Sequence, residues 1–165
     1  MSRFTFDFLE PKRTAQYLPA MYDILYTNMS KIAPTGNTYE ADKIMWSDCV
    51  LPLYSQGQCK VILIYSGQEL AGYFQYRLSE DTFYMDDIQF RPEYQGSGVF
   101  ADLYRYLVKI IPPETHYVSA LSNKHNIKSQ DVLKHLGLEI IGESKNGNSL
   151  HFHGNYAYIV RKYRR

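Results

Sequence analysis

Hydrophobic positions recur along the chain with two different spacings, and each change of spacing marks a new predicted element. Phe4, Phe6 and Phe8 alternate with polar residues, which indicates a short strand near the N-terminus. Over residues 12–29 the apolar side chains fall three or four positions apart, as on one face of a helix. The first half is predicted to hold strands at 4–8, 60–65, 70–77 and 82–90 and helices at 12–29 and 40–54.

The second half opens with a helix whose apolar stripe is well defined. Val99, Leu103 and Leu107 lie on one side of a helix over residues 98–111, and Pro112-Pro113 ends it. Shorter elements follow, and alternation over much of the last run predicts a strand there. These later elements are strands at 117–121, 138–141 and 150–160 and a helix at 127–136.

The order of these elements, β-α-α-β-β-β-α-β-α-β-β, predicts a mixed α/β domain. Short turns separate the three strands between residues 60 and 90, and turns of this length join antiparallel neighbours. The helix at 98–111 lies between two strands and predicts a βαβ crossover in the middle of the chain. Because the sequence has no repeat and no linker, residues 1–165 are predicted to form a single domain.

Composition and charge limit the classes of function. The 165 residues are 45% hydrophobic and 21% charged, which is the composition of a globular protein and excludes a disordered chain. The 18 Lys and Arg balance 17 Asp and Glu, so the chain lacks the basic excess of a general nucleic-acid binder or of a protein drawn to anionic membranes. Any phosphate group must therefore be bound by a local feature.

The cysteine content and the N-terminal sequence predict a location in the cytoplasm. Cys49 and Cys59 are too few for a disulfide framework, and both are predicted to be reduced. The N-terminus lacks the apolar stretch of a signal peptide. The longest apolar run, 61–65, is far shorter than the roughly 20 residues that span a bilayer. We therefore expect a soluble cytoplasmic protein with no membrane partner.

The most informative segment joins the strand at 82–90 to the helix at 98–111 through the turn Gln95-Gly96-Ser97-Gly98. The first N–H groups of a helix have no partners within it and lie at the positive end of its dipole, and glycines let an anion approach them. The turn is therefore a candidate pyrophosphate site. It is not a Walker loop, because no Gly-Lys-Ser/Thr follows, and it lacks the third glycine of the dinucleotide fingerprint.

The residues around this turn resemble the coenzyme A-binding motif of the GNAT superfamily of N-acetyltransferases. Phe90 and Pro92 match the hydrophobic-x-Pro strand end of that motif, and Gln95 and Gly98 match its Gln/Arg-x-x-Gly-x-Gly/Ala pattern. Phe100 departs from the pattern, because the family has Gly or Ala at that position.

A second stretch extends the resemblance towards the C-terminus. Asn123-Lys-His-Asn126 precedes a helix that closes with Gly137, and it is similar to the family's second conserved stretch. The order of strands and helices also matches, so the resemblance covers nearly the whole chain and implies a GNAT-like fold. It implies transfer of an acyl group, usually the acetyl group of acetyl-coenzyme A, without a metal, to a primary amine of a small molecule or a protein, and it leaves open whether the acyl group is acetyl or longer.

The resemblance also implies which residues bind the co-substrate. The backbone at the end of the strand would bind the pantetheine arm where two strands part after a bulge, and the turn would hold the pyrophosphate. For Arg91, Lys124 and Lys128, phosphate binding and a solvated surface position are both open. The implied cofactor-binding residues are Ile88, Gln89, Phe90, Gln95, Gly96, Ser97, Gly98, Val99, Asn126 and Ser129.

Catalysis requires that the amine lose a proton. An alkyl amine with a pKa near 10.4 is unprotonated in only about one molecule per thousand at neutral pH, so a carboxylate beside the thioester would assist. Asp86 and Asp87 occupy the positions where many relatives carry an acid. Because consecutive strand residues face opposite sides, at most one is expected to face the acceptor. Relatives often use a helix tyrosine to protonate the thiolate, but that position is Leu133 here, and Tyr94 is a possible substitute.

Other readings of the sequence stay open at this point. A non-catalytic acyl-coenzyme A-binding module is the main alternative, because Phe100 and Leu133 depart from the family pattern. His151 and His153 share a face of the last strand, and a packing or acceptor-site role is favoured over a metal site because no third ligand is evident. The basic C-terminal tail favours a solvated end over a nucleic-acid arm. A homodimer is also left open, and the motifs do not identify the acceptor.

Overall fold

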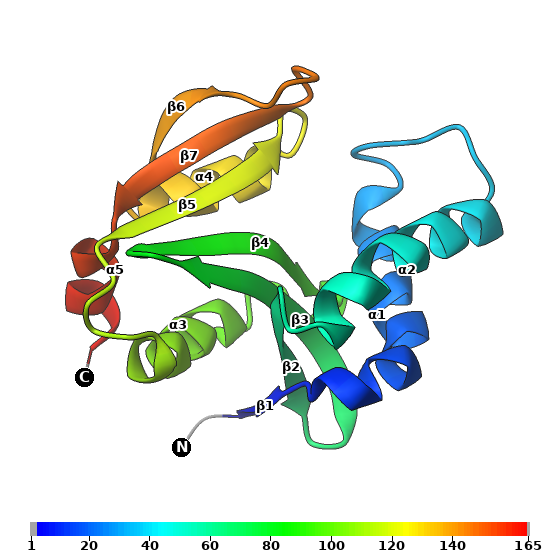
Figure 1. Ribbon diagram of the computed structural model, residues 1–165, viewed down its shortest axis with the longest axis horizontal. Helices are drawn as coiled ribbons and strands as arrows, with labels where there is room; N and C mark the ends of the chain where they lie inside the picture. Colours follow the sequence, from blue (N-terminus) through cyan, green and yellow to red (C-terminus); the bar gives the residue numbers. More distant parts are fainter. Residues whose placement is uncertain (1–2, 165) are drawn as a thin grey trace. The chain divides into compact units, whose positions relative to one another are not determined.

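The computed structural model describes residues 3–164, in which seven strands, five α helices and two 3₁₀ turns follow one another (Figure 1). No helix in this part of the chain is both long enough and apolar enough to cross a membrane. The strands are β1 (Phe4–Phe8), β2 (Lys60–Ser66), β3 (Glu69–Ser79), β4 (Thr82–Phe90), β5 (Tyr117–Asn123), β6 (Glu139–Glu143) and β7 (Ser149–Asn155). The helices are α1 (Thr14–Met29), α2 (Tyr39–Ser55), α3 (Val99–Ile110), α4 (Ile127–His135) and α5 (Tyr156–Tyr163), and the 3₁₀ turns are Pro11–Arg13 and Pro92–Tyr94.

The strands form one mixed sheet in the order β1-β2-β3-β4-β5-β7-β6. β1 pairs with β2, β5 with β7, and β6 with β7, all antiparallel. β4 and β5 are parallel, which agrees with the crossover predicted through α3, and their ladder runs from Thr82 opposite Tyr117 to Met85 opposite Ala120. The mixed α/β class predicted from the sequence is therefore confirmed.

The chain divides into two compact units, and each is described by itself. The first unit comprises Met1–Gln75 and Asp87–Val99, and the second comprises Tyr76–Asp86 and Phe100–Arg165. The first unit holds β1, β2, α1 and α2, and the second holds β5, β6, β7, α4 and α5. β3, β4 and α3 contribute residues to both units, so the candidate residues on β4 fall partly in each.

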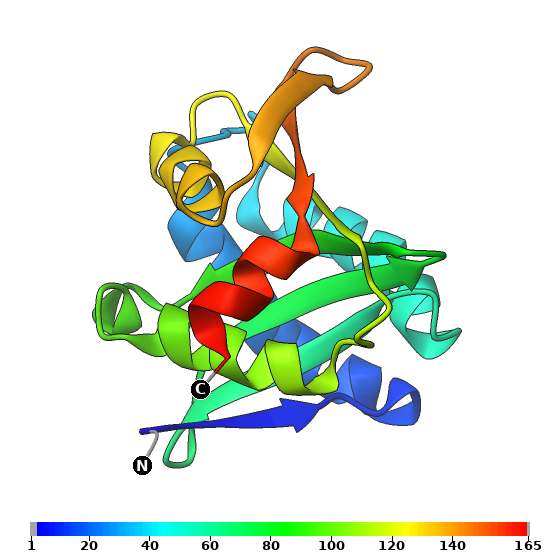
Figure 2. The same cartoon turned by 90° about the vertical axis from the view of Figure 1, so that its left-hand side faces the viewer.

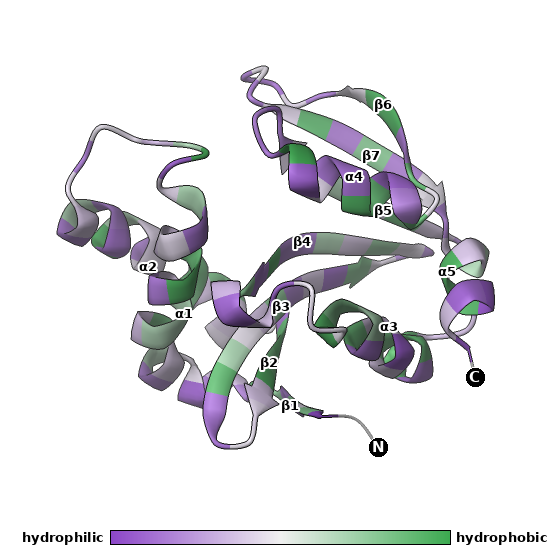
Figure 3. Ribbon diagram, turned by 180° about the vertical axis from the view of Figure 1, so that it is seen from behind, coloured by the Kyte–Doolittle hydropathy of each residue, from purple (hydrophilic) through white to green (hydrophobic). Residues whose placement is uncertain are grey.

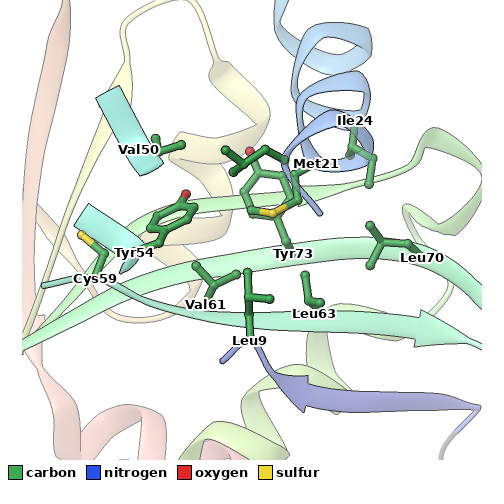
Figure 4. Close-up of a cluster of buried hydrophobic side chains, with 11 residues drawn as sticks. Leu9, Met21, Ile24, Val50, Tyr54, Cys59, Val61, Leu63, Leu70 and Tyr73 are labelled. Atoms are coloured by element: carbon green, nitrogen blue, oxygen red, sulfur yellow. The ribbon is translucent and has the colours of Figure 1, made fainter. Parts of the chain in front are cut away.

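In the first unit, α1 and α2 pack against the strands through a buried cluster (Figure 4). Met21 and Ile24 of α1 are three residues apart, and Val50 and Tyr54 of α2 are four apart, which is the spacing of one helical face. The Tyr73 ring of β3 lies among these side chains and is fully buried. The cluster comprises Leu9, Leu18, Met21, Ile24, Val50, Tyr54, Cys59, Val61, Leu63, Leu70 and Tyr73.

In the second unit, helices pack against one face of the strands. The Tyr104 hydroxyl of α3 donates to the Met85 sulfur at 2.9 Å, and the Tyr156 ring of α5 meets the Phe83 ring edge-on at 6.0 Å. Tyr104 also contacts Tyr163, so α3 and α5 lie side by side (Figure 2). Hydropathy alternates along β7, as expected for a strand with one buried face (Figure 3).

The prediction of a strand over residues 150–160 is wrong for the second half of that range. The structure has β7 over Ser149–Asn155, followed at once by α5 over Tyr156–Tyr163. The alternation of strand β7 ends at Asn155, and the buried residues Tyr156, Ile159 and Tyr163 then fall three and four positions apart. The period therefore changes inside the run, and Tyr156 begins a helical face that packs into the core of the second unit.

Gly72 of β3 leaves no room for a side chain next to the end of β4. A Cβ atom at this position would be 2.3 Å from the Gln89 carbonyl oxygen and 2.7 Å from the Phe90 ring. We expect Gly72→Ala to lower the free energy of unfolding by about 1–3 kcal/mol in urea titrations, because the two strands must move apart. Gly142→Ala is the matched control, because a Cβ at that strand glycine meets no atom within 4 Å. Equal effects of the two changes would contradict this account.

Candidate functional site

The segment Gln95–Gly98, called the glycine turn here, connects the end of β4 to the first residue of α3. Gly96 and Gly98 have φ angles of +77° and +89°, which favour glycine, and a Cβ at either position would meet no atom within 4 Å. The turn is exposed, whereas Val99 at the start of α3 is buried. This geometry leaves open space over a backbone at the positive end of a helix dipole, as an anion site requires.

Two side chains that precede the glycine turn contact other elements of the first unit. The Tyr94 ring packs edge-on against Phe4 at 5.9 Å, and its hydroxyl donates to the Glu69 carboxylate at 2.6 Å. This hydrogen bond raises the pKa of Tyr94 above its ordinary value. The Arg91 Nε donates to the Leu70 carbonyl at 2.6 Å. Tyr94 and Arg91 therefore both anchor the segment that precedes the turn.

Asp87 receives hydrogen bonds from two neutral side chains of the first unit. The Tyr73 hydroxyl donates to Oδ2 at 2.7 Å, and the Gln89 amide donates to Oδ1 at 2.9 Å. Burial, followed by the charge of Asp87 and this hydrogen bond, raises the pKa of Tyr73 well above its ordinary value. Tyr73 therefore stays a hydrogen-bond donor, and hydrogen bonds from both donors stabilise the charged form of the carboxylate.

Asp86, in the second unit, has a cationic partner instead. The Arg77 guanidinium donates through Nε to Oδ2 at 2.8 Å and through Nη2 to Oδ1 at 3.0 Å. The same guanidinium lies 4.7 Å above the centre of the Tyr84 ring. This two-point ion pair neutralises the charge of Asp86 within the sheet.

The partners of the two carboxylates, Tyr73 and Arg77, are four residues apart on β3. Residues of a regular strand that are an even number apart share a face, whereas consecutive residues such as Asp86 and Asp87 lie on opposite faces. Both contacts together require β3 or β4 to depart from regular alternation here, as a β-bulge does. Strand alternation alone therefore does not show which carboxylate has which environment, whereas the hydrogen-bond partners do.

Three predicted cofactor-binding residues lie at the end of β4, where Ile88, Gln89 and Phe90 are half-buried. The β4–β5 ladder ends at Met85 and Ala120, before these residues are reached. The Phe90 carbonyl accepts hydrogen bonds from the side-chain amides of Asn28 at 2.8 Å and Gln95 at 3.1 Å. The side chains of α1 and of the glycine turn thus meet at the end of β4.

The other predicted cofactor-binding residues, Asn126 and Ser129, belong to the start of α4 in the second unit. The Asn126 Oδ1 accepts from the Ser129 N–H at 3.1 Å, which makes Asn126 the N-cap of this helix. Lys124 forms a 2.9 Å ion pair with Glu143. The structure gives Asn126 a capping role, and its contact with a cofactor stays a prediction.

The two positions that depart from the family pattern both pack within the second unit. The Phe100 ring lies 4.5 Å from the Tyr104 ring along α3. Leu133 is buried at 7% exposure. Neither position carries a titratable group, so the helix position at which relatives often have a tyrosine supplies no proton in this chain.

The two histidines of β7 have separate partners on β5. The His151 Nε2 is 2.6 Å from the Ser119 hydroxyl, and the His153 ring stacks on Tyr117 at 5.2 Å. Among residues 3–164, no group of three or more His, Cys, Asp and Glu side chains is arranged to hold a metal ion.

Sequence reasoning missed the residues that orient the carboxylates and the strand end: Asn28, Tyr73 and Arg77. Asn28 lies 61 residues from Gln89 along the chain and has no motif around it. Tyr73 and Arg77 lie 14 and 9 residues from their carboxylate partners. The alternation of their segment predicts a strand but does not indicate which residues their side chains contact. A predicted hairpin register between β3 and β4 is the only local signal that points to them.

The end of β4, the glycine turn and the N-terminus of α3 follow one another in the order of the coenzyme A-binding motif that the sequence resembles. Comparison with family models identifies the family. The model of the acetyltransferase (GNAT) family matches residues 18–138, and the chain belongs to this family. No curated protein matches the sequence.

Solved structures of several acetyltransferases have a similar fold. An acetyltransferase from Thermus thermophilus has a TM-score of 0.69 at 18% identity, over 94% of this chain and 99% of that chain. The PaiA N-acetyltransferase from Thermoplasma acidophilum, solved in complex with coenzyme A, has a TM-score of 0.75 at 12% identity, over 94% and 100%. A mutant spermidine N-acetyltransferase from Vibrio cholerae has a TM-score of 0.65 at 12% identity, over 98% and 99%.

Two buried tyrosines allow a test of the Asp87 carboxylate. Tyr73 donates to this charged group, whereas the Tyr54 hydroxyl donates to the neutral Gln75 amide at 2.6 Å. We expect Tyr73→Phe to lower the free energy of unfolding by about 1.5–3 kcal/mol and Tyr54→Phe by about 0.5–1.5 kcal/mol, because hydrogen bonds to charged acceptors are stronger. Chemical denaturation at neutral pH measures both. A larger loss for Tyr54→Phe would show that Asp87 is not held as a carboxylate.

Proposed function

We propose that the protein is an N-acetyltransferase that transfers an acetyl group from acetyl-coenzyme A to a primary amine of a small molecule or a protein. The observation that carries the proposal is the glycine turn, with two left-handed glycines and open space at the N-terminus of α3. Membership of the GNAT acetyltransferase family supports the reaction class. A cytoplasmic location is part of the same proposal, because acetyl-coenzyme A is an intracellular metabolite.

On this proposal, the backbone of the glycine turn and the first turn of α3 hold the pyrophosphate of coenzyme A. The helix terminus contributes the equivalent of roughly half a positive charge, which suits a protein with no general basic excess. Coenzyme A carries the acetyl group as a thioester, which an amine can attack directly. Because the Phe90 carbonyl already accepts from Asn28 and Gln95, the pantetheine arm would pair with other backbone groups of residues 88–90.

The proposed reaction is a single direct transfer. The amine nitrogen forms a bond to the acetyl carbon, the bond from that carbon to sulfur breaks, and the sulfur keeps the electron pair. The nitrogen gives up a proton, and the thiolate takes one to become the free thiol. Two residue functions therefore matter: one group that removes the proton from nitrogen, and a site that orients the amine.

We propose Asp87 as the carboxylate that removes this proton, directly or through a water molecule. Its donors Tyr73 and Gln89 are neutral side chains, and together they hold the carboxylate in a fixed orientation. Asp86 is the weaker candidate, because proton uptake there would break the two-point ion pair with Arg77. Asp86 and Arg77 act, on this proposal, as a structural pair of the second unit.

The leaving thiolate places a smaller demand on the protein. A thiol with a pKa of about 8.5 is a fair leaving group, so direct protonation by water is sufficient when the helix position holds Leu133. The Tyr94 hydroxyl is the remaining candidate acid named from the sequence. Its hydrogen bond to Glu69 favours an anchoring role for Tyr94 over proton donation.

The alternative function is a non-catalytic module that binds acyl-coenzyme A. The burial of Leu133 at the family's tyrosine position is the observation that favours it. Acetyl-coenzyme A binding with no release of thiol over a broad amine panel would support this alternative. Spermidine and aminoglycosides are the first amines for that panel, because a spermidine N-acetyltransferase and an aminoglycoside acetyltransferase have similar folds.

The glycine turn is tested by a charge placed in the anion site. We expect Gly98→Glu to abolish the thermal stabilisation given by acetyl-coenzyme A, because its carboxylate repels the pyrophosphate. Gly98→Gln shares the size and the strain of that substitution without its charge, and we expect it to retain part of the stabilisation. Gly57→Glu adds the same charge at another glycine of positive φ, with no atom within 4 Å, and should leave binding unchanged. Full binding by Gly98→Glu would refute the pyrophosphate site.

The proposed base is tested by comparing the two neighbouring acids. We expect Asp87→Asn to lower kcat by about 10²–10⁴-fold with little change in the affinity for acetyl-coenzyme A, because only proton removal is lost. Asp86→Asn should lower the free energy of unfolding, because it removes the ion pair with Arg77, and it should lower kcat much less than Asp87→Asn does. Thiol release, measured with the best amine of the panel, gives both kcat values. A greater loss of kcat for Asp86→Asn would reverse the assignment.

A further inference from the structure

Four polar side chains of the first unit form a continuous chain of hydrogen bonds from the glycine turn to Asp87. The Gln95 Nε2 donates to the Asn28 Oδ1 at 3.3 Å, and the Asn28 Nδ2 donates to the Gln89 Oε1 at 3.1 Å. The Gln89 Nε2 then donates to the Asp87 Oδ1 at 2.9 Å. Each member touches the next, so a shift of the turn can reach the carboxylate.

The direction of these hydrogen bonds is uniform. Gln95 donates at the start of the chain, and Asn28 and Gln89 each accept on the amide oxygen and donate from the amide nitrogen towards Asp87, where the chain ends on an anion. Hydrogen bonds aligned in this way polarise one another, and a terminal charge strengthens the last of them. The Asn28 amide accepts one hydrogen bond and donates two, to Gln89 and to the Phe90 carbonyl. A hydroxyl group has only one donor, a carboxylate has none, and an alkyl group can neither donate nor accept.

The side-chain amides of Asn28 and Gln95 also hold the backbone at the end of β4. The Phe90 carbonyl accepts from Asn28 at 2.8 Å and from Gln95 at 3.1 Å, which uses both lone pairs of the carbonyl oxygen. Asn28 therefore contacts the strand end, the side chain that holds Asp87, and the first residue of the glycine turn. It lies one residue before the end of α1, on an element that the co-substrate motifs do not include.

We infer that Asn28 is a positioning residue that couples the glycine turn to Asp87. When an anion restrains the turn, the Gln95 amide is held against Asn28, and the orientation of Gln89 and Asp87 is restrained with it. Bound co-substrate thus keeps the carboxylate in its working orientation, and by linkage a fixed Asp87 favours co-substrate binding. This inference rests on the proposed function, because it assigns the base of that reaction a partner.

A purely structural role for Asn28 predicts something different. If its amide only fastens α1 to β4, its removal lowers the stability of the fold and leaves the turnover of the folded enzyme unchanged. The experiment must therefore separate turnover from stability, and it must show that the effect passes through Asp87.

We expect Asn28→Ala to lower kcat by about 10–100-fold, with less than a threefold change in the KM for the amine, because misplacement of a catalytic group costs rate more than binding. Gln95→Ala breaks the chain at its exposed end, where a folding defect is not expected, and should lower kcat in the same way. Asn37→Ala is the matched control: it removes an exposed amide of the first unit that donates to Asp42 and should not change kcat.

A double-mutant cycle tests whether the effect passes through Asp87. In the Asp87→Asn background, Asn28→Ala should cause less than a twofold further loss of kcat, because the group that it positions is already gone. Multiplicative losses in the double variant would overturn the inference, as would wild-type kcat in both Asn28→Ala and Gln95→Ala.

Hydrogen exchange gives a readout that does not depend on turnover. Coenzyme A should slow amide exchange at residues 86–90 in the wild-type protein, and Asn28→Ala should lose that protection while still binding coenzyme A. Unchanged protection in the variant would overturn the coupling. If the wild-type protein shows Asn28-dependent protection but no acetylation of any amine, the proposed function fails while the coupling stands.

Discussion

The end of β4 is the constraint on which the site depends. The ladder with β5 stops at Met85, and the polar groups of the strand beyond that point need other partners, because buried unpaired groups are costly. The partners come from α1, from β3 and from the glycine turn. Asn28 and Gln95 satisfy the Phe90 carbonyl, and Tyr73 holds Asp87. The strand end is thus fixed by side chains at the place where the family motif leads into the helix.

The contrast between Asp86 and Asp87 shows how neighbouring residues of one type acquire different chemistry. Each carboxylate accepts hydrogen bonds on both oxygens, but Asp86 accepts them from a cation and Asp87 accepts them from two neutral groups. A carboxylate paired with Arg77 gains its stability from charge compensation, which proton uptake would remove. The neutral donors of Asp87 fix its orientation by hydrogen bonds. The difference lies in the side chains that surround the acids and not in the acids themselves.

Several tyrosines of this protein combine a buried ring with a hydrogen-bonded hydroxyl group. Tyr54, Tyr73 and Tyr104 are almost fully buried, and their hydroxyls donate to Gln75, Asp87 and the Met85 sulfur. Each ring fills a large volume of the core while its tip reaches a polar partner. The abundance of tyrosine among the 165 residues is thus explained in part by packing, and at Tyr73 packing and the orientation of a candidate base coincide.

The sequence by itself determined the order of the elements and the place of the candidate co-substrate site, because these follow from local periodicity and from glycines at a strand-to-helix turn. It failed where the period changes within one run, at Tyr156, and where partners are distant. Asn28 lies 61 residues from Gln89, so no local pattern could pair them. Only the tertiary structure decided which acid meets Arg77 and which meets Tyr73, because strand alternation is interrupted there and hydrogen-bond partners are set by the packing of elements that are separate in sequence.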